Sequence, residues 1–395
     1  MQTLSVSLAA LVALRLATPA SATDKTSFIT TLGRDTVVVE SVVRTGDRVT
    51  GDIVVRVPGT VHLHYEITLR ADGSVARATL DQDPMGTANI SVTHVVIDFG
   101  ADSVRTTIDA NGQESRAAHA MEDGIAPTLM TGFDASYGLY SSMGLYELLL
   151  ARAKPAVNDT LTFPGIDLVS GRILQRQFVA RTTTMIDVDY FGVLWTHLTV
   201  DATGRITAAD ARNTTEKTLT QRVPYVDAGA VAKSFAAADR SGNGIGIASP
   251  NLIAKGTIGG HTVTVTYGSP RRRGRTILGN VIVYDRVWRT GANAATTIAF
   301  DAPMTIGDST LPAGTYSLYS LPKADGTVQL IVNAQHGQWG TDYDRAKDIA
   351  YIPMRVSAAP SPQEDFAISI TGSGNRGELR VSWDTFVWRV PIAVK

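Results

Sequence analysis

Short stretches in which apolar and polar residues alternate run through most of the chain from residue 35 onward. They are rich in valine, isoleucine and threonine, and turn residues such as Gly46-Asp47 and Asn111-Gly112 separate them. Successive side chains of a β-strand point to opposite faces, so alternation predicts strands. The pattern predicts an all-β protein, with N-terminal strands at 36–44, 50–57, 61–70, 74–81, 90–99, 103–109, 172–180, 183–188, 194–201 and 206–211.

One segment predicts a helix instead, over residues 140–154. Leu145, Leu148, Leu149 and Arg152 fall at helical spacing, and Pro155 marks the end. A long antiparallel sheet with one apolar helix predicts a curved sheet or partial barrel whose open side the helix covers. The helix either fills the core or lies over a cavity for an apolar ligand. At the level of pattern this arrangement resembles the incomplete barrels of periplasmic lipoprotein carriers.

A glycine-rich segment divides the chain. Residues 228–238 are small and mildly helical in pattern, and they lead into the run DRSGNGIGIASP. Such a shift in composition indicates a domain boundary, so we expect a linker at 241–250 between domains at 23–240 and 251–395. The second domain shows short strands and almost no helix, which is typical of a jelly-roll-like β-sandwich. Its strands are predicted at 262–267, 296–301, 315–321, 328–333, 348–356, 366–371, 378–384 and 386–394, the last two as a hairpin-like pair.

The first 22 residues are mostly apolar and end in Ala20-Ser21-Ala22, the small-x-small pattern that a signal peptidase recognises. We expect a cleaved signal peptide and a periplasmic or secreted protein. The sequence has no cysteine, which excludes disulfides, thiolate metal sites and the lipidated cysteine of an exported lipoprotein. No later segment has the roughly 20 apolar residues of a transmembrane helix. A net charge of -1 suggests neither nucleic acid nor an anionic membrane as a partner.

Four separated motifs in the C-terminal domain occur in the order of a known bacterial family. They are TVTVTYGSPRRRGRTILG, VWRTGANAATT, LPAGTYSLYSLP and IVNAQHGQWGTDYD, and they extend over roughly residues 258–370. On these motifs the domain resembles the domain-of-unknown-function family 2911 (DUF2911). The resemblance implies an exported bacterial protein and leaves the function open. No motif assigns the N-terminal domain to a family.

The family-like motifs contain arginine, tryptophan and aspartate in predicted loops. Such loops at the rim of a sandwich can bind a carboxylate, a phosphate or a sugar, through bidentate hydrogen bonds and ring stacking. Alternatively, Arg275 and Arg289 form ion pairs with Asp344 or Asp348 that fix the loops, while residues 271–273 are solvated. The candidate ligand-binding residues are Arg275, Trp288, Arg289, Asn293, His336, Trp339, Tyr343 and Asp344.

The predicted strand VHLHYEITLR places His62, His64 and Glu66 on one face. Two histidines two positions apart on a strand can bind one metal ion, so His62 and His64 are candidate metal ligands. A polar, solvent-facing side of a half-buried strand would show the same pattern. We expect no cofactor, because the sequence has no Walker loop, no dinucleotide-binding glycine pattern after a strand and no HExxH pair.

Three hypotheses of function follow. The first is a non-enzymatic binding or structural module whose C-terminal loops bind a small polar or anionic ligand or a protein partner. The second is a cell-envelope hydrolase that uses the same loops. His336 with Asp342 or Asp344 and a serine such as Ser269 or Ser320 supplies the ingredients of a triad, but no Gly-x-Ser-x-Gly elbow positions the serine. The third is a carrier of apolar cargo in the N-terminal domain.

Overall fold

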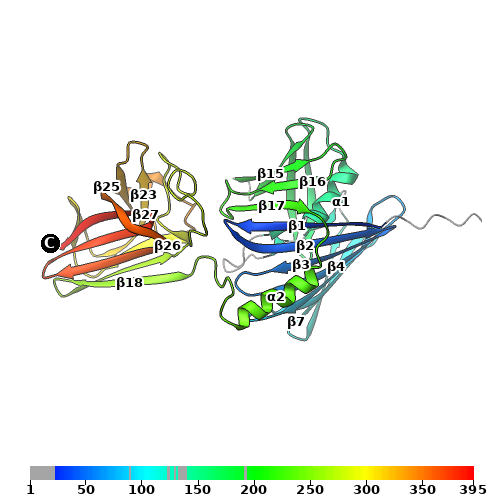
Figure 1. Cartoon of the computed structure of the whole chain (residues 1–395), viewed down its shortest axis with the longest axis horizontal. Helices are drawn as coiled ribbons and strands as arrows, with labels where there is room; N and C mark the ends of the chain where they lie inside the picture. The colour runs from blue at the N-terminus through cyan, green and yellow to red at the C-terminus, as the bar shows by residue number, and fades with distance from the viewer. Residues whose placement is uncertain (1–22, 89, 122–124, 129, 132–139, 191–193) are drawn as a thin grey trace, which may run out of the picture.

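The computed structural model describes residues 23–88, 90–121, 125–128, 130–131, 140–190 and 194–395 (Figure 1). The predicted signal peptide, at residues 1–22, lies outside the described residues. The described chain is mostly β and forms a large N-terminal sheet followed by two C-terminal sheets, which confirms the predicted fold class. Each of these regions has its own large apolar core. None of the helices in the described part of the chain is long and apolar enough to cross a membrane.

Fifteen strands form the N-terminal sheet, in the order β8-β7-β6-β5-β4-β3-β2-β1-β17-β16-β15-β14-β13-β12-β9. All neighbours are antiparallel except β9 and β12, which are parallel. The sheet does not close into a barrel over its described residues. The strands are β1 (Asp24–Leu32), β2 (Asp35–Thr45), β3 (Arg48–Val55), β4 (Val61–Leu69), β5 (Val75–Pro84), β6 (Val92–Phe99), β7 (Ser103–Ala110), β8 (Gln113–Ala120), β9 (Ala126–Thr128), β12 (Thr160–Asp167), β13 (Ile173–Ala180), β14 (Met185–Tyr190), β15 (Leu194–Val200), β16 (Ile206–Asp210) and β17 (Thr218–Val223).

Two runs of sequential strands make up this sheet. Strands β1 to β8 pair in chain order, as do β12 to β17, and the pairing of β1 with β17 joins the two runs. A buried hydrogen bond between two hydroxyl groups stabilises this pairing, because the Oγ1 atoms of Thr30 and Thr220 lie 2.8 Å apart. A separate two-stranded sheet consists of β10 (Met130–Thr131) and β11 (Tyr140–Ser141).

Two helices pack on opposite faces of the N-terminal sheet. Helix α1 (Met143–Ala153) contributes Leu145 and Leu150 to the main core, on the same face as Phe28. Helix α2 (Ala228–Arg240) packs against a separate small cluster that contains Val39 and Val54. Alternation along β1 explains the separation, because Phe28 and its neighbour Ile29 point to different faces. The predicted covering helix is confirmed, and α2 extends the short helical pattern seen at 228–238.

The C-terminal region is a two-sheet sandwich, as predicted. Six strands form one sheet, in the order β18 (Asn251–Ile258), β19 (His261–Gly268), β20 (Ala292–Phe300), β23 (Gly314–Pro322), β24 (Val328–Asn333) and β25 (Asp348–Pro353). The other sheet consists of β22 (Ser309–Leu311), β21 (Met304–Ile306), β27 (Arg376–Val394) and β26 (Arg355–Ser373). A short 3-10 helix, η1 (Arg345–Lys347), precedes β25.

The end of the chain differs from the prediction. Residues 378–394 do not form a hairpin-like pair but belong to the single long strand β27, which pairs with the equally long β26. Asp384 explains the pattern, since its φ of 47° and the register shift between Gln363 and Ala367 interrupt the alternation without ending the strand. In the sequence, the interrupted alternation at Asp384 therefore has the pattern of a turn between two strands.

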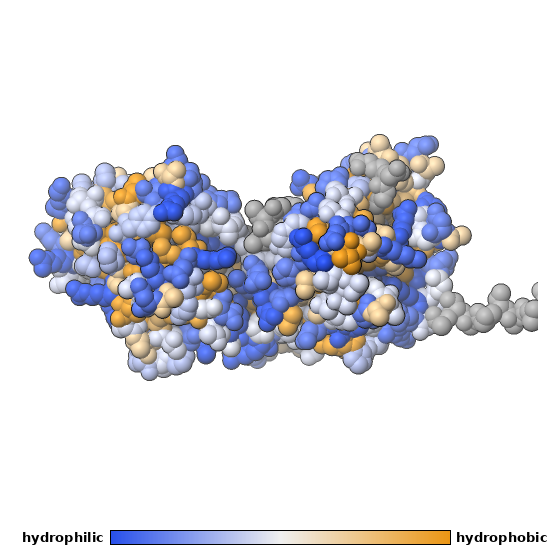
Figure 2. Space-filling view, turned by 90° about the horizontal axis from the view of Figure 1, so that it is seen from above, coloured by the Kyte–Doolittle hydropathy of each residue, from blue (hydrophilic) through white to orange (hydrophobic). Residues whose placement is uncertain are grey.

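Figure 2 shows a mostly hydrophilic surface with separate hydrophobic patches on both regions. Some of the exposed apolar side chains of the C-terminal region lie on edge strands. Ile253 on β18 is 60% exposed and Tyr351 on β25 is 40% exposed, and these strands are the two edges of the six-stranded sheet.

Candidate functional site

The arginine-rich loop that follows β19 contacts the N-terminal region. Arg273 is buried, and its Nη1 donates a hydrogen bond to Asp35 Oδ2. The backbone N–H of Arg34 donates to the carbonyl oxygen of Arg273 at 2.9 Å. The expectation that residues 271–273 are solvated is therefore wrong for Arg273. Its loop packs against the β1–β2 turn, where a Cβ on Gly33 would lie 2.3 Å from the Arg273 carbonyl oxygen.

Arg275 stabilises this loop from within. Its Nε donates to the carbonyl oxygen of Arg272 at 3.0 Å, and its Nη2 donates to that of Arg271 at 2.5 Å. Burial, with a further contribution from the charge of Arg273, lowers the pKa of Arg275 to about 10. Arg275 thus bonds backbone carbonyls of its own loop, and the loop belongs to the contact between the two regions.

Three of the predicted ligand-binding residues lie together in the C-terminal region. The Arg289 guanidinium lies 6.0 Å from the ring centroid of Trp339, and Arg289 Nη1 lies 3.5 Å from the Asn293 carbonyl oxygen. Asn293 Nδ2 donates to the carbonyl oxygen of Ser249 at 3.1 Å. Trp339 is 37% exposed, so this group, Arg289, Asn293 and Trp339, includes an accessible ring.

The other candidates of the C-terminal loops are dispersed. Trp288 packs in an aromatic cluster of the sandwich core, stacked on Trp383 with centroids 6.3 Å apart. The Tyr343 hydroxyl donates to Asp348 Oδ2, and Asp344 Oδ1 accepts from the Ala346 N–H at the start of η1. His336 is exposed. These contacts stabilise loops, and binding of a ligand by the eight candidates stays a prediction.

His62 and His64 share one acceptor on the neighbouring strand. His62 Nε2 and His64 Nδ1 each lie 2.9 Å from Asp52 Oδ1. Burial alone would raise the pKa of Asp52, but the hydrogen bonds from the two imidazoles outweigh it and hold that pKa well below its usual value. The hydrogen bond to Asp52 in turn raises the pKa of His64. No group of three or more His, Cys, Asp or Glu in the described residues is arranged to hold a metal ion, and metal binding by the pair stays a prediction.

Helix α1 is anchored inside the N-terminal sheet by two buried carboxylates. Glu40 of β2 accepts hydrogen bonds at the helix N-terminus from the Met143 N–H at 2.8 Å and from the Ser142 hydroxyl. Glu147, on the helix itself, accepts from Arg44 Nη2 at 2.9 Å and from Arg222. Negative charge at a helix N-terminus and charge-assisted bonds are both favourable. The first turns of α1 are therefore fixed, which confirms that the helix fills part of the core.

An apolar cavity of about 270 Å³ lies beside the second half of α1. Leu148 and Leu149 are half-buried and point to it from the helix, and Phe163 and Phe178 line it from β12 and β13. The two phenylalanine rings stack with centroids 5.2 Å apart. The remaining lining residues come from the β4–β5 turn, β9, β12 and α1: Leu69, Gly73, Val75, Ala126, Pro127, Leu145, Leu150, Arg152, Ala153, Leu161 and Thr162. Helix α1 thus fills core space and also borders a cavity.

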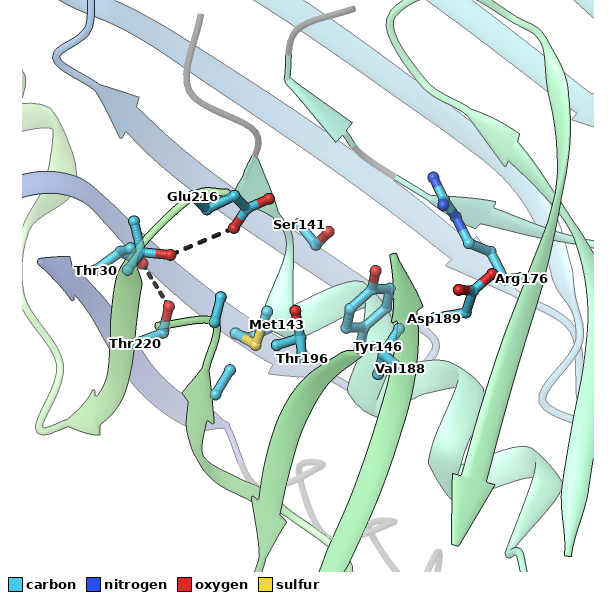
Figure 3. A pocket seen from close by; sticks show the side chains of 13 residues that line it. Thr30, Ser141, Met143, Tyr146, Arg176, Val188, Asp189, Thr196, Glu216 and Thr220 are labelled. Carbon is cyan, nitrogen blue, oxygen red and sulfur yellow. Dashed lines mark hydrogen bonds between the residues drawn. The ribbon is translucent and has the colours of Figure 1, made fainter. Parts of the chain in front are cut away.

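A second, polar cavity of about 40 Å³ is bordered by Tyr146 of α1 (Figure 3). Figure 3 shows Tyr146 between Glu216 and Arg176, which come from the β16–β17 loop and from β13. Arg176 is only 6% exposed, and neither its Nε nor its Nη2 has a hydrogen-bond partner among the described residues. Hydroxyl groups of Thr30, Ser141, Thr196, Thr218 and Thr220 also border the space, with Met143, Val188, Asp189, Ala209 and Ala211.

Glu216, a carboxyl group of this cavity, has a pKa that burial shifts. Its side chain is partly buried, and this burial raises the pKa of Glu216 to about 8, against the opposing effect of a hydrogen bond from Thr218 Oγ1 at 3.3 Å. At neutral pH the carboxyl group is therefore mostly protonated and can donate a hydrogen bond. The cavity combines one buried cation with a neutral acid, a second carboxyl group, Asp189, and several hydroxyls.

Comparison with known proteins bears on the C-terminal region. Residues 249–392 match the family described as "Protein of unknown function (DUF2911)". This match confirms that the C-terminal region resembles DUF2911. The DUF2911 match includes the whole arginine-rich loop and extends beyond the four motifs, whereas the N-terminal region matches no family.

Other comparisons give little. No curated protein matches the chain. Among solved structures, a DUF1089 family protein from Pseudomonas aeruginosa is similar with 12% sequence identity and a TM-score of 0.30, over 44% of this chain and 88% of that one. A score this low supports no argument about fold or function.

Proposed function

We propose that the protein is a binding protein or carrier for an apolar ligand, held beside α1 in the N-terminal region. The observation that carries this proposal is the apolar cavity, whose volume is close to the lower end of the about 300–1,000 Å³ typical of small-molecule sites. Leu148, Leu149 and Phe163 are only half-buried around it, so they keep apolar surface that a ligand would remove from water. The anchored first turns of α1 would keep the cavity walls in place.

The C-terminal loops support a second candidate function, the binding of a small polar or anionic ligand. The exposed ring of Trp339 beside the Arg289 guanidinium is the observation that favours it. Hydrolysis of cell-envelope material by the same loops stays a prediction. We also propose that the N-terminal signal peptide directs export. We further propose that a linker at 241–250 joins two domains, and the separate apolar cores support this division.

Titration with the uncharged apolar fluorophore N-phenylnaphthylamine tests the apolar site. We expect a saturable rise in fluorescence with the natural protein. Leu149→Asp places a carboxylate in the apolar lining and should weaken binding at least about tenfold. Val157→Asp is the matched control, because Val157 is 43% exposed and outside the cavity lining. Absence of binding to the natural protein, or equal binding by both variants, would contradict the proposal.

A further inference from the structure

The exposed residues that line the apolar cavity beside α1 show where it meets solvent. Four of its lining residues are exposed, and three of these lie at the C-terminal end of α1 and in the β4–β5 turn: Arg152, Ala153 and Gly73. A Cβ on Gly73 would meet none of the described atoms within 4 Å, so the turn leaves space beside it. The fourth exposed residue, Thr162, lies on β12. These four residues form the mouth of the cavity.

Burial along one stripe of α1 gives the direction of the cavity. Leu145, Leu148, Leu149 and Arg152 share a face of the helix, because residues three or four positions apart are neighbours. Leu145 is 1% exposed, the next two leucines are half-buried, and Arg152 is exposed. The cavity therefore runs from an apolar interior to the mouth at the end of the helix. A ligand inside it would have one end among apolar side chains and the other end in water.

Arg152 is the only charged residue that lines this cavity. In the described part of the chain it has no hydrogen bond and no ion pair within 4.0 Å. Its charge reaches Asp72 of the β4–β5 turn, since the pKa of Asp72 is lowered mainly by hydrogen bonds from Ser74 and further by the charges of Arg152 and Arg70. The Asp72 carboxylate accepts from the Ser74 N–H at 2.8 Å. Two arginines and one aspartate thus leave an excess of positive charge at the mouth.

We propose that the ligand is an amphiphile with one apolar chain and an anionic head group, that the chain lies beside α1, and that Arg152 binds the head at the mouth of the cavity. This inference rests on the proposed function, since it specifies the ligand class of the same site. A volume of about 270 Å³ suits one small ligand. The head stays in contact with water, so neither its charge nor that of Arg152 is buried on binding. The guanidinium can form two charge-assisted hydrogen bonds with it.

Decanoate and decanol, which have the same chain, test the inference by displacement of N-phenylnaphthylamine at about pH 8, where the carboxylate is ionised. The readout is the ratio of decanoate affinity to decanol affinity, because the ratio cancels effects on the chain. Arg152→Gln should lower this ratio about two- to fivefold, the effect of one exposed ion pair, and leave decanol affinity unchanged. Arg152→Glu should lower it further by repulsion. Sodium chloride at about 0.5 M should lower the ratio of the natural protein, because salt screens exposed charges.

The matched control is Lys154→Gln, because Lys154 lies at the same end of α1 and is exposed but does not line the cavity. Thermal unfolding shows whether each variant is folded, and the salt dependence of the natural protein decides the question if a variant is not. A ratio that neither Arg152→Gln nor salt lowers, or an equal fall in Lys154→Gln, overturns the inference and leaves the apolar carrier intact. Absence of binding by both ligands and by the fluorophore overturns both.

Discussion

Arg273 and Asp35 are 238 positions apart in the sequence, yet Arg273 Nη1 donates a hydrogen bond to Asp35 Oδ2. The pair joins the C-terminal region to the first turn of the N-terminal sheet. Glu364 adds to the contact, because its Oε2 lies 3.8 Å from Arg34 Nη2 of that turn. Lys217 of the N-terminal region lies close by as well, since burial and the charges of Arg289 and Arg275 lower its pKa. The two regions therefore contact each other through charged groups.

Asp35→Asn should weaken this contact. Arg273 is buried, so the loss of its charged partner leaves an uncompensated cation, whereas Asp35 itself is partly exposed. We expect a loss of about 2–3 kcal/mol, below the roughly 3–5 kcal/mol of a fully buried pair. Urea unfolding measures it, and faster proteolysis within residues 241–250 reports the loosened contact. Asp47→Asn, at an exposed turn, is the control, and a similar effect of both substitutions would contradict the assignment.

Glu147→Gln should destabilise the N-terminal region. Glu147 is 3% exposed and accepts hydrogen bonds from Arg44, Arg222 and the Ile206 N–H, so a neutral amide leaves two guanidiniums without a counter-charge. We expect a loss of about 3–5 kcal/mol. Glu114→Gln is the control, since its surface pair with Arg116 should contribute only about 0–1 kcal/mol. Thermal unfolding compares the two, and a melting temperature for Glu147→Gln equal to that of the control would count against an anchoring role.

The pair Asp52–His64 should make stability depend on pH. The pKa of His64 is raised in the folded state, so its contribution is complete below the unfolded value of about 6.5 and is lost as pH rises through the folded value. The pKa of Asp52 is lowered, so its contribution is present above the unfolded value of 3.8 and is lost only in strong acid. Urea unfolding from about pH 5 to pH 8 should show the decline, and His64→Asn should flatten it. An unchanged slope in the variant would refute this coupling.

Regular alternation made most of the sheet predictable, and two segments that were not predicted lack it. Strand β8 has the sequence QESRAAHA and is exposed on almost all positions, because it is the edge of the sheet, so no apolar face shows in its sequence. Strand β26 contains Pro360 and Pro362 next to a register shift, and prolines usually argue against a strand. Packing and pairing partners, rather than local preference, determine these elements.

The sites show the same contrast. The shared face of His62 and His64 follows from the period of a strand, whereas Asp52 comes from the neighbouring strand and carries no signal of its own. Arg176 lies in ILQRQFVA, where an arginine in a half-apolar strand looks solvent-facing, and Glu216 lies in a polar loop. Only the sheet brings them together, so the sequence gives no local sign of the polar cavity.

The pairing of β1 with β17 has a consequence for folding. Each run of sequential strands closes only short loops, but the Thr30–Thr220 contact closes a loop of about 190 residues, which costs more conformational entropy and is slower to form. Both threonines border the polar cavity. The polar cavity that Arg176 borders is therefore complete only after this long-range closure.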